Sequence, residues 1–327
     1  MIMRRVMLVA VVGMVGASLG ACGSSTGEEQ AGSACITAVT AHEADAKAIC
    51  TKAADLGNAD GMAGLGLLAN EAGDAAAAKS WYQKSADLGS SNGMFNLGVL
   101  AHDAGDAAAA KSWWQKAAEL GNSDGLAGLG LLANDAGDAA AAKSWYQKSA
   151  DLGSSIGMFN LGVIALDAGD NAAAKSWWQK AAKLGNSGGM VNLGQLADEA
   201  GDQVAATSWW EKAAELGNSN AMINLGVLAD DAGDTAAAKS WWQKAAELGN
   251  PTGMVGLGQL AEKAGDKASA KSWYQKAAEL GNSNAMVNLG VLAYEEDDAT
   301  LAKSWWQKAA DLGNETAVDA LAKLGAS

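Results

Sequence analysis

The residues of this 327-residue chain that could do chemistry are three cysteines, two histidines and periodic sets of asparagines and aspartates. Neither His42 nor His102 has a serine or cysteine nucleophile at a plausible spacing, and the glycines form no phosphate-binding loop. No pair of cysteines has the spacing of zinc ligands. We therefore expect no catalytic residues, no metal site and no cofactor.

The first cysteine, Cys22, closes a segment with the layout of a secretory signal peptide. Met1–Arg5 carries two positive charges, Val6–Val15 is almost wholly apolar, and the sequence Leu-Gly-Ala-Cys follows. Small residues before a cysteine resemble the lipobox of bacterial lipoproteins. That resemblance implies that residues 1–21 are removed and that Cys22 carries the lipid. The alternative is ordinary cleavage near Ala21, which would leave Cys22 as a free thiol.

The interpretation of residues 1–22 as a lipoprotein leader also suggests a role for the residues that come next. Residues 22–33 are polar and rich in small side chains, which is typical of a flexible tether. The expected location is the bacterial cell envelope, where the exported chain would be anchored to a membrane by its lipid. In an exported protein a disulfide can persist.

Cys35 and Cys50 are the two cysteines that such a disulfide could join. Residues 46–57 match the second half of the repeat described below, so residues 34–57 are interpreted as a degenerate first unit. Its two helices would turn near residues 42–44, and an antiparallel arrangement would bring the two cysteines level. We predict a Cys35–Cys50 bridge, and the alternative is a pair of buried thiols.

The secondary-structure elements that must position these residues belong to a sequence repeat of 32 residues. A tryptophan opens an aromatic pair at each step. The tryptophans are Trp81, Trp113, Trp145, Trp177, Trp209, Trp241, Trp273 and Trp305. The second aromatic of each pair is Tyr82, Trp114, Tyr146, Trp178, Trp210, Trp242, Tyr274 or Trp306. A fixed period of this length indicates stacked supersecondary units rather than a globule with one core.

Each unit is predicted to be a helical hairpin. In residues 58–89, Asn58 is placed to cap the first helix and Asp74 the second. Gly66 lies inside the apolar stripe of the first helix, where glycine costs about 1 kcal/mol relative to alanine. We expect its purpose to be a close approach of the second helix. Gly73 is expected to end the first helix in the left-handed conformation.

The predicted fold is therefore an all-α, right-handed α-solenoid of about eight 32-residue helix-turn-helix repeats over residues 58–313. The degenerate unit at 34–57 precedes it, and residues 314–327 form a C-terminal capping helix. Unit eight departs from the others because Asp297 replaces the glycine of the turn, so its turn should be strained or differently shaped.

The repeat resembles the Sel1-like subclass of the tetratricopeptide family. The resemblance rests on Asn-Leu-Gly in the first helix, Gly-Asp at the turn and Trp-Trp-Gln-Lys-Ala-Ala-Glu-Leu-Gly in the second. The turn inside the unit is shorter than is usual for Sel1-like repeats. The family implies an adaptor whose concave face, lined by the first helices, binds a peptide or protein segment.

By this resemblance, the candidate binding residues lie on the first helices. An asparagine precedes Leu-Gly in five units, at Asn96, Asn160, Asn192, Asn224 and Asn288. An amide side chain both donates and accepts hydrogen bonds, which suits a peptide backbone. Asp198 and Asp230, further along, would make the groove acidic and favour a basic segment. The alternatives are amides bonded within their own turn and a solvated helix end.

Net charge narrows the class of partner. The chain carries −14, which would repel nucleic acid. The leading hypothesis is a membrane-anchored, extracytoplasmic scaffold that binds a peptide or protein. Cell-wall glycan binding through exposed tryptophans is one alternative, although burial of these rings between units is expected. A structural spacer without a specific ligand is the other.

Overall fold

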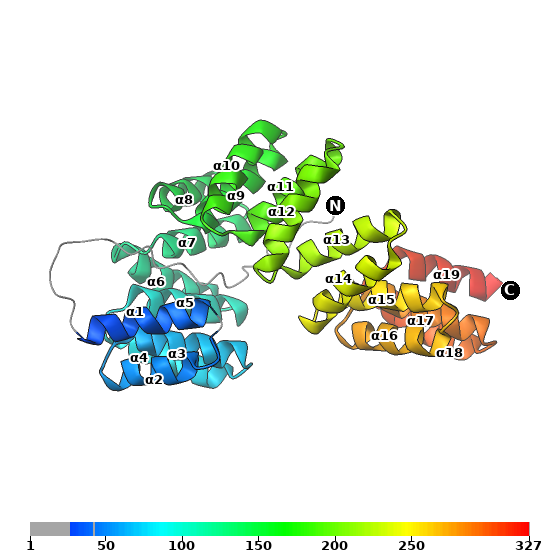
Figure 1. Cartoon of the computed structure of the whole chain (residues 1–327), viewed down its shortest axis with the longest axis horizontal. Helices are drawn as coiled ribbons and strands as arrows, with labels where there is room; N and C mark the ends of the chain where they lie inside the picture. The colour runs from blue at the N-terminus through cyan, green and yellow to red at the C-terminus, as the bar shows by residue number, and fades with distance from the viewer. Residues whose placement is uncertain (1–26, 42, 327) are drawn as a thin grey trace. The chain divides into compact units, whose positions relative to one another are not determined.

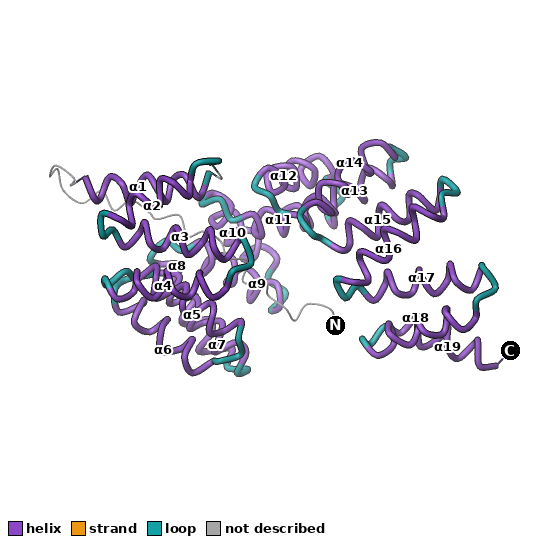
Figure 2. The backbone as a smooth tube through the Cα atoms, turned by 90° about the horizontal axis from the view of Figure 1, so that it is seen from below, coloured by secondary structure: helices purple, strands orange, loops and turns teal. Residues whose placement is uncertain are grey.

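A computed structural model describes residues 27–41 and 43–326, and these form helices joined by short turns, with no strand. The chain divides between Asn186 and Ser187 into two compact parts. Figure 1 shows the helices of each part, coloured along the chain. Figure 2 shows that turns alone separate successive helices. The prediction of an all-α solenoid is confirmed.

Nineteen helices make up the described residues. The first part contains α1 (Gly27–Thr40), α2 (Ala46–Asp55), α3 (Ala59–Glu71), α4 (Ala75–Asp87), α5 (Ser91–Asp103), α6 (Ala107–Glu119), α7 (Ser123–Asp135), α8 (Ala139–Asp151), α9 (Ser155–Asp167) and α10 (Asn171–Lys183). The second part contains α11 (Ser187–Glu199), α12 (Gln203–Glu215), α13 (Ser219–Asp231), α14 (Thr235–Glu247), α15 (Pro251–Lys263), α16 (Lys267–Glu279), α17 (Ser283–Glu295), α18 (Ala299–Asp311) and α19 (Glu315–Ala326).

The eight predicted hairpins run from α3–α4 to α17–α18, four in each part. We refer to the odd-numbered helix of each hairpin as the first helix and to the even-numbered one as the second helix. Each first helix packs most extensively against the second helix of its own hairpin. Each repeat therefore contributes the same supersecondary unit, as its sequence predicts.

Caps fix where these helices begin and end. The Asp74 carboxylate accepts a hydrogen bond from the backbone N–H of Ala77 at 2.9 Å, and the same cap recurs in all eight hairpins. Gly73 ends α3 with φ of +77°. In α17 the equivalent residue is Asp297, which takes the same left-handed conformation at φ +64°. The turn thus keeps the shape that it has in the other hairpins. The predicted strain arises because Asp297 has a Cβ, which the left-handed conformation crowds.

The caps of successive first helices are also joined to each other. Asn122 caps α7 and donates from its side chain to Asn92 Oδ1 at 3.1 Å, at the start of α5. In the second part Asn250 donates to Ser219 Oγ at 3.0 Å in the same way. These bonds tie the N-terminal ends of neighbouring first helices together, so the hairpins stack in a fixed register.

Aromatic rings set the distance between the two helices of a hairpin. The second aromatic of each pair is only 0–6% exposed in all eight hairpins. A Cβ on Gly66 would overlap the ring of Tyr82, and a Cβ on Gly98 would overlap Trp114. The indole N–H of Trp114 donates to the Phe95 carbonyl at 3.1 Å. The glycine inside each first helix is therefore required for ring packing, as predicted.

The N-terminal unit differs from the prediction at its start. Residues 27–33 form the first turns of α1, whereas the sequence predicts a tether there. Gly32 packs directly against Asn58, and the Asn58 amide donates to the Glu28 carbonyl at 3.0 Å. These contacts with α3, together with helix-favouring Glu-Glu-Gln-Ala, extend the helix toward the N-terminus. Residues 22–26 lie outside the described residues.

A disulfide joins Cys35 of α1 to Cys50 of α2, which is the pair that the sequence predicts. Both cysteines are fully buried, and their sulfur atoms lie against Gly64 of α3. The bridge therefore sits where later hairpins place an aromatic ring. At the other end, α19 packs on α18 and buries Ala317, in the position expected of a capping helix.

Candidate functional site

Few of the residues that could do chemistry lie close together in the described part of the chain. No group of three or more His, Cys, Asp or Glu side chains there is arranged to hold a metal ion. His102 Nε2 lies 3.0 Å from Asp135 Oδ2 on the neighbouring first helix. Among the helices that the structure describes, none has the length and apolar character to cross a bilayer. Cys22 and His42 lie outside the described residues.

The candidate binding residues lie on one stripe of the first helices, at positions three residues apart. In α13, for example, the stripe consists of Asn224, Val227 and Asp230. Residues spaced by three or four lie on the same face of a helix. The stripe therefore combines the predicted asparagine, a middle residue and the predicted acidic residue. Its character differs between the two parts of the chain.

In the first part the stripe is less exposed than in the second. Asn160 is 5% exposed and donates from its side chain to the Ile156 carbonyl of its own helix at 2.9 Å. Asn96 makes the same bond to the Asn92 carbonyl. The middle position holds four apolar residues: Leu131 is 4% exposed, and Leu67, Val99 and Val163 are half-buried. Here the structure matches the alternative of amides bonded within their own turn.

In the second part the stripe is open, and we call its residues on α11, α13, α15 and α17 the open stripe. The open stripe comprises Asn192, Gln195, Asp198, Asn224, Val227, Asp230, Gln259, Glu262, Asn288, Val291 and Tyr294. Val227 is 46% exposed and Val291 is 39% exposed. Asn192 and Asn224 are half-buried and make no hydrogen bond to any described residue. Four of the seven predicted binding residues thus gather on α11 and α13.

Packing between first helices explains the difference. In the first part α3, α5, α7 and α9 pack directly against one another in succession. Contacts between successive first helices are less extensive from α11 to α17. The middle residues are consequently left in solvent there, and two of them, Gln195 and Gln259, are polar. The sequence signal for this surface is the appearance of glutamine at a position that is always apolar in the first part.

The asparagine position also has a packing role. In the hairpin after Trp114 it is Gly128, and in the hairpin after Trp242 it is Gly256. A Cβ on either glycine would overlap the tryptophan ring of the preceding hairpin. Asparagine follows all three hairpins that bury a tyrosine, and it also follows the hairpins that bury Trp178 and Trp210. Asn288 lies within hydrogen-bonding reach of Tyr274.

The acidic residues of the open stripe have different partners. Asp198 is half-buried and makes no ion pair or hydrogen bond to a described residue. Asp230 receives Lys263, whose Nζ lies 2.7 and 3.0 Å from the two carboxylate oxygens. Glu262 accepts the Tyr274 hydroxyl at 2.8 Å. The open stripe is thus acidic, and Lys263, which lies beside it on α15, pairs with Asp230.

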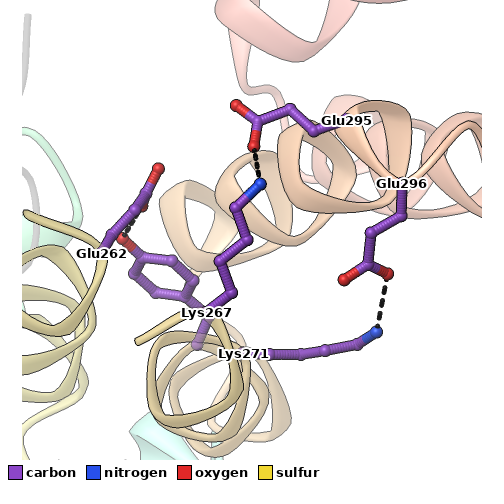
Figure 3. A network of polar contacts seen from close by, with 6 residues as sticks. Glu262, Lys267, Lys271, Glu295 and Glu296 are labelled. Atoms are coloured by element: carbon purple, nitrogen blue, oxygen red, sulfur yellow. Dashed lines mark hydrogen bonds and ion pairs between the residues drawn. The ribbon is translucent and has the colours of Figure 1, made fainter. Parts of the chain in front are cut away.

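The end of the open stripe is held by a polar network. Figure 3 shows Lys267 of α16 reaching Glu295 at 2.8 Å. In the same view Lys271 reaches Glu296 at 3.2 Å. These pairs join one hairpin to the next and neutralise carboxylates beside the turn of α17. Exposed ion pairs of this kind contribute little to stability but restrict the turn.

The first tryptophan of each pair has a lysine ammonium over its ring. These rings are half-buried, and a lysine three residues later places its Nζ above each ring, 4.1–4.7 Å from the centroid. Lys84 over Trp81 is one example, at 4.1 Å. A sugar would have to displace this cation–π contact before it could stack. The geometry does not favour glycan binding through these residues.

Comparison with known proteins gives the same repeat. The sequence pattern described as "Sel1 repeat" matches residues 59–90, 91–122, 126–154, 155–186, 189–218, 219–250, 254–282 and 283–314. No curated protein sequence matches the chain.

Two solved structures share both fold and moderate identity. One is a Sel1 repeat protein from Oxalobacter formigenes, with 25% identity over 89% of this chain and 93% of that chain, at a TM-score of 0.54. The other is a protective antigen of uropathogenic Escherichia coli strains displaying an SLR fold. It has 28% identity over 91% of this chain and 74% of that chain, at a TM-score of 0.51. Eight matched repeats cover most of residues 59–314, and the chain therefore belongs to the Sel1 repeat family.

Proposed function

We propose that this chain is an exported, lipid-anchored scaffold that binds a basic peptide or protein segment on the open stripe. Sel1 and tetratricopeptide solenoids typically serve as scaffolds for protein–protein interaction. The observation that supports this site is the half-buried pair Asn192 and Asn224, whose amides have no partner among the described residues. Half-buried amides without partners suit a peptide backbone, which offers both donors and acceptors.

Exposed apolar side chains add to this argument. Val227 and Val291 lie one turn beyond the asparagine position of their helices, and each exposes more than a third of its surface. Tyr294 is 52% exposed and packs against Trp306, with ring centroids 5.9 Å apart. A segment bound along the stripe would cover these side chains and bring its cations near Asp198. Both apolar burial and charge complementarity then contribute to binding.

Export and anchoring rest on different observations. The N-terminal sequence up to Cys22 has the pattern of a lipoprotein leader. The buried Cys35–Cys50 disulfide is compatible with an oxidising compartment. The first described helix begins at Gly27, so only a few residues separate Cys22 from the folded part. The scaffold would therefore be held close to the membrane.

Site-specific photo-crosslinking in intact cells tests the binding site. A photoreactive residue at Val227 should capture a partner, because this side chain is exposed on the open stripe. Capture should fall when Asn192 and Asn224 are both changed to alanine. The matched control places the photoreactive residue at Val99, the same position on α5 in the first part. Equal capture at Val99, or capture unaffected by the two alanines, would refute the proposed site.

The anchor is tested separately by changing Cys22→Ala. The unmodified protein should fractionate with membranes and incorporate a labelled fatty acid, whereas the variant should lose both properties. Membrane association that survives Cys22→Ala would rule out this anchor without affecting the proposed binding site.

A further inference from the structure

The exposed apolar side chains of the first part form one regular set. Among its described residues, the large hydrophobic side chains that are exposed are five leucines, each 42–59% accessible. Each leucine is the C-cap residue of an even-numbered helix and lies three positions before the next first helix begins. Exposed apolar surface that recurs in this way is typical of an interaction site. We call this set the leucine edge: Leu56, Leu88, Leu120, Leu152 and Leu184.

Contacts between the first helices show that these leucines follow one edge of the first part. Asn58, which caps α3, donates to the Glu28 carbonyl at the start of α1 at 3.0 Å. Asn58 and Ser90, the caps of α3 and α5, line one surface cavity. Ser154, which caps α9, donates to Asp124 Oδ1 in the first turn of α7 at 2.6 Å, and the cap of α7 is bonded to the start of α5. The N-terminal ends of these helices therefore lie side by side, with the leucines next to them.

The chain enters the first part at the same edge. Glu28 is the second residue of α1, and it lines the surface cavity together with Leu88. Cys22 lies five positions before Gly27 in the sequence, and a fully extended chain of that length spans roughly 17 Å. A lipid on Cys22 would therefore hold the leucine edge close to a bilayer, because the attachment point and the edge are at the same end of the first helices.

Charge decides which kind of bilayer the leucine edge can meet. An exposed acidic residue directly precedes four of the five leucines, at Asp55, Asp87, Glu119 and Asp151. These carboxylates would be repelled by anionic headgroups. Neutral headgroups allow the leucines to enter the interface while the carboxylates remain in water. Each leucine is already about half covered by the protein, so the edge adds too little apolar area to replace a lipid anchor.

From this arrangement we infer that the leucine edge rests on a bilayer surface of neutral headgroups, with its leucines in the interface. The lipid on Cys22 attaches the protein, and the leucine edge determines which end of the first helices in the first part faces the membrane. The inference rests on the proposed function, because it requires the attachment at Cys22. It adds a second membrane contact to that anchor.

The test uses the lipidated, full-length protein reconstituted with phosphatidylcholine vesicles. Leu88→Cys and Leu120→Cys each place a thiol on the leucine edge, and the control Ala104→Cys places one at the turn after α5, at the opposite end of that helix. The native disulfide and the lipidated cysteine leave the introduced thiol free for a nitrobenzoxadiazole dye. On vesicles both edge labels should emit at shorter wavelength and be quenched by lipids with a spin-labelled acyl chain. The control label should show neither change.

The composition of the vesicles and the position of the label separate the outcomes. Phosphatidylglycerol in the vesicles should reduce the wavelength shift, and a larger shift would overturn the inference. Edge labels that remain in water on vesicle-bound protein would overturn it while leaving the anchor intact. Equal changes at all three labels, or a shift at the edge without vesicles, would overturn it in favour of dye partitioning or of contact between protein copies. Protein that incorporates no labelled fatty acid and does not bind vesicles would refute the anchor and the inference together.

Discussion

At the scale of single residues, the left-handed turn between the two helices of a hairpin places a specific demand on the chain. Seven of the eight hairpins place glycine there, and the eighth places Asp297 at φ +64°. A Cβ in this region is crowded by the backbone, at a cost of roughly 1–2 kcal/mol that aspartate only partly avoids. The turn of α17 therefore carries strain that its neighbours lack.

Asp297→Gly should remove this strain and stabilise the protein by about 0.5–1 kcal/mol, because the gain exceeds the extra entropy of glycine in the unfolded chain. Urea unfolding followed by circular dichroism measures the change. The reverse substitution in the preceding hairpin, Gly265→Asp, should destabilise by a similar amount. An unchanged midpoint in both variants would contradict the argument.

Three tyrosines make the stability of the fold sensitive to alkaline pH. Burial raises the pKa of Tyr82 and of Tyr146, with a smaller contribution from a neighbouring carboxylate in each case. Burial also raises the pKa of Tyr274, which additionally donates to Glu262. In the unfolded chain a tyrosine ionises near pH 10. The stability that these groups contribute is thus fully present below about pH 10 and is lost as pH rises toward their folded pKa values.

The free energy of unfolding should therefore fall above pH 10, by up to about 1.4 kcal/mol per pH unit for each tyrosine. Tyr146→Phe keeps the ring but removes the titrating hydroxyl, so this variant should lose less stability between pH 10 and pH 11 than the unmodified protein. Urea midpoints at the two pH values give the comparison, and lysine titration is common to both proteins. Identical losses would show that Tyr146 ionises normally in the fold.

At the scale of elements, the N-terminal unit formed by α1 and α2 is stabilised by different interactions from the eight hairpins that follow it. The helices α1 and α2 lack the aromatic pair, and the Cys35–Cys50 disulfide takes its place against Gly64. A cross-link that closes a loop of this length, 15 residues in sequence separation, stabilises by about 3 kcal/mol through the entropy of the unfolded chain. The disulfide thus compensates for the small side chains of this unit.

Changing both Cys35 and Cys50 to alanine should loosen α1 and α2 while the hairpins from α5 onward stay folded. Hydrogen exchange followed by mass spectrometry would show faster exchange in residues 27–56. Adding a reductant to the unmodified protein should produce the same pattern, and adding it to the double variant should produce no further change. Uniform acceleration along the whole chain would argue against a local staple.

At the scale of the whole molecule, stability comes from interfaces between neighbours. Each hairpin buries its ring against its own glycine, and caps link it to the next hairpin. In such a stack a local defect destabilises the adjacent repeats most, and its effect on stability decreases with distance along the chain.

Gly226→Ala places a Cβ into the ring of Trp242, so we expect a loss of about 1–3 kcal/mol from overpacking despite the better helix propensity of alanine. Hydrogen exchange should accelerate in α13 and α14 and in their neighbours within the second part, but not in α3 to α6. Ser240→Ala, at an exposed position of α14, is the control and should have little effect. Accelerated exchange throughout would mean that the chain unfolds as one unit.

The sequence alone was enough to predict the hairpins, because their period, caps and glycines are local features. Asn58, Gly66, Gly73 and Asp74 all have the roles expected from their positions, and the Cys35–Cys50 pair follows from the register of two antiparallel helices. The eight-fold recurrence of each residue made these assignments strong. The start of α1 was not predictable, because it depends on packing of Gly32 against Asn58, which is distant in sequence.

The tertiary structure decided which copies of one motif are accessible. Asn160 and Asn224 occupy equivalent positions, yet Asn160 is buried and bonded to its own helix, whereas Asn224 is half-buried without a partner. Nothing in the local motif separates the two. Accessibility depends on how closely successive first helices approach, and that distance is set by side chains from neighbouring hairpins. The repeat therefore specifies the scaffold, while the spacing between its copies determines where a partner could bind.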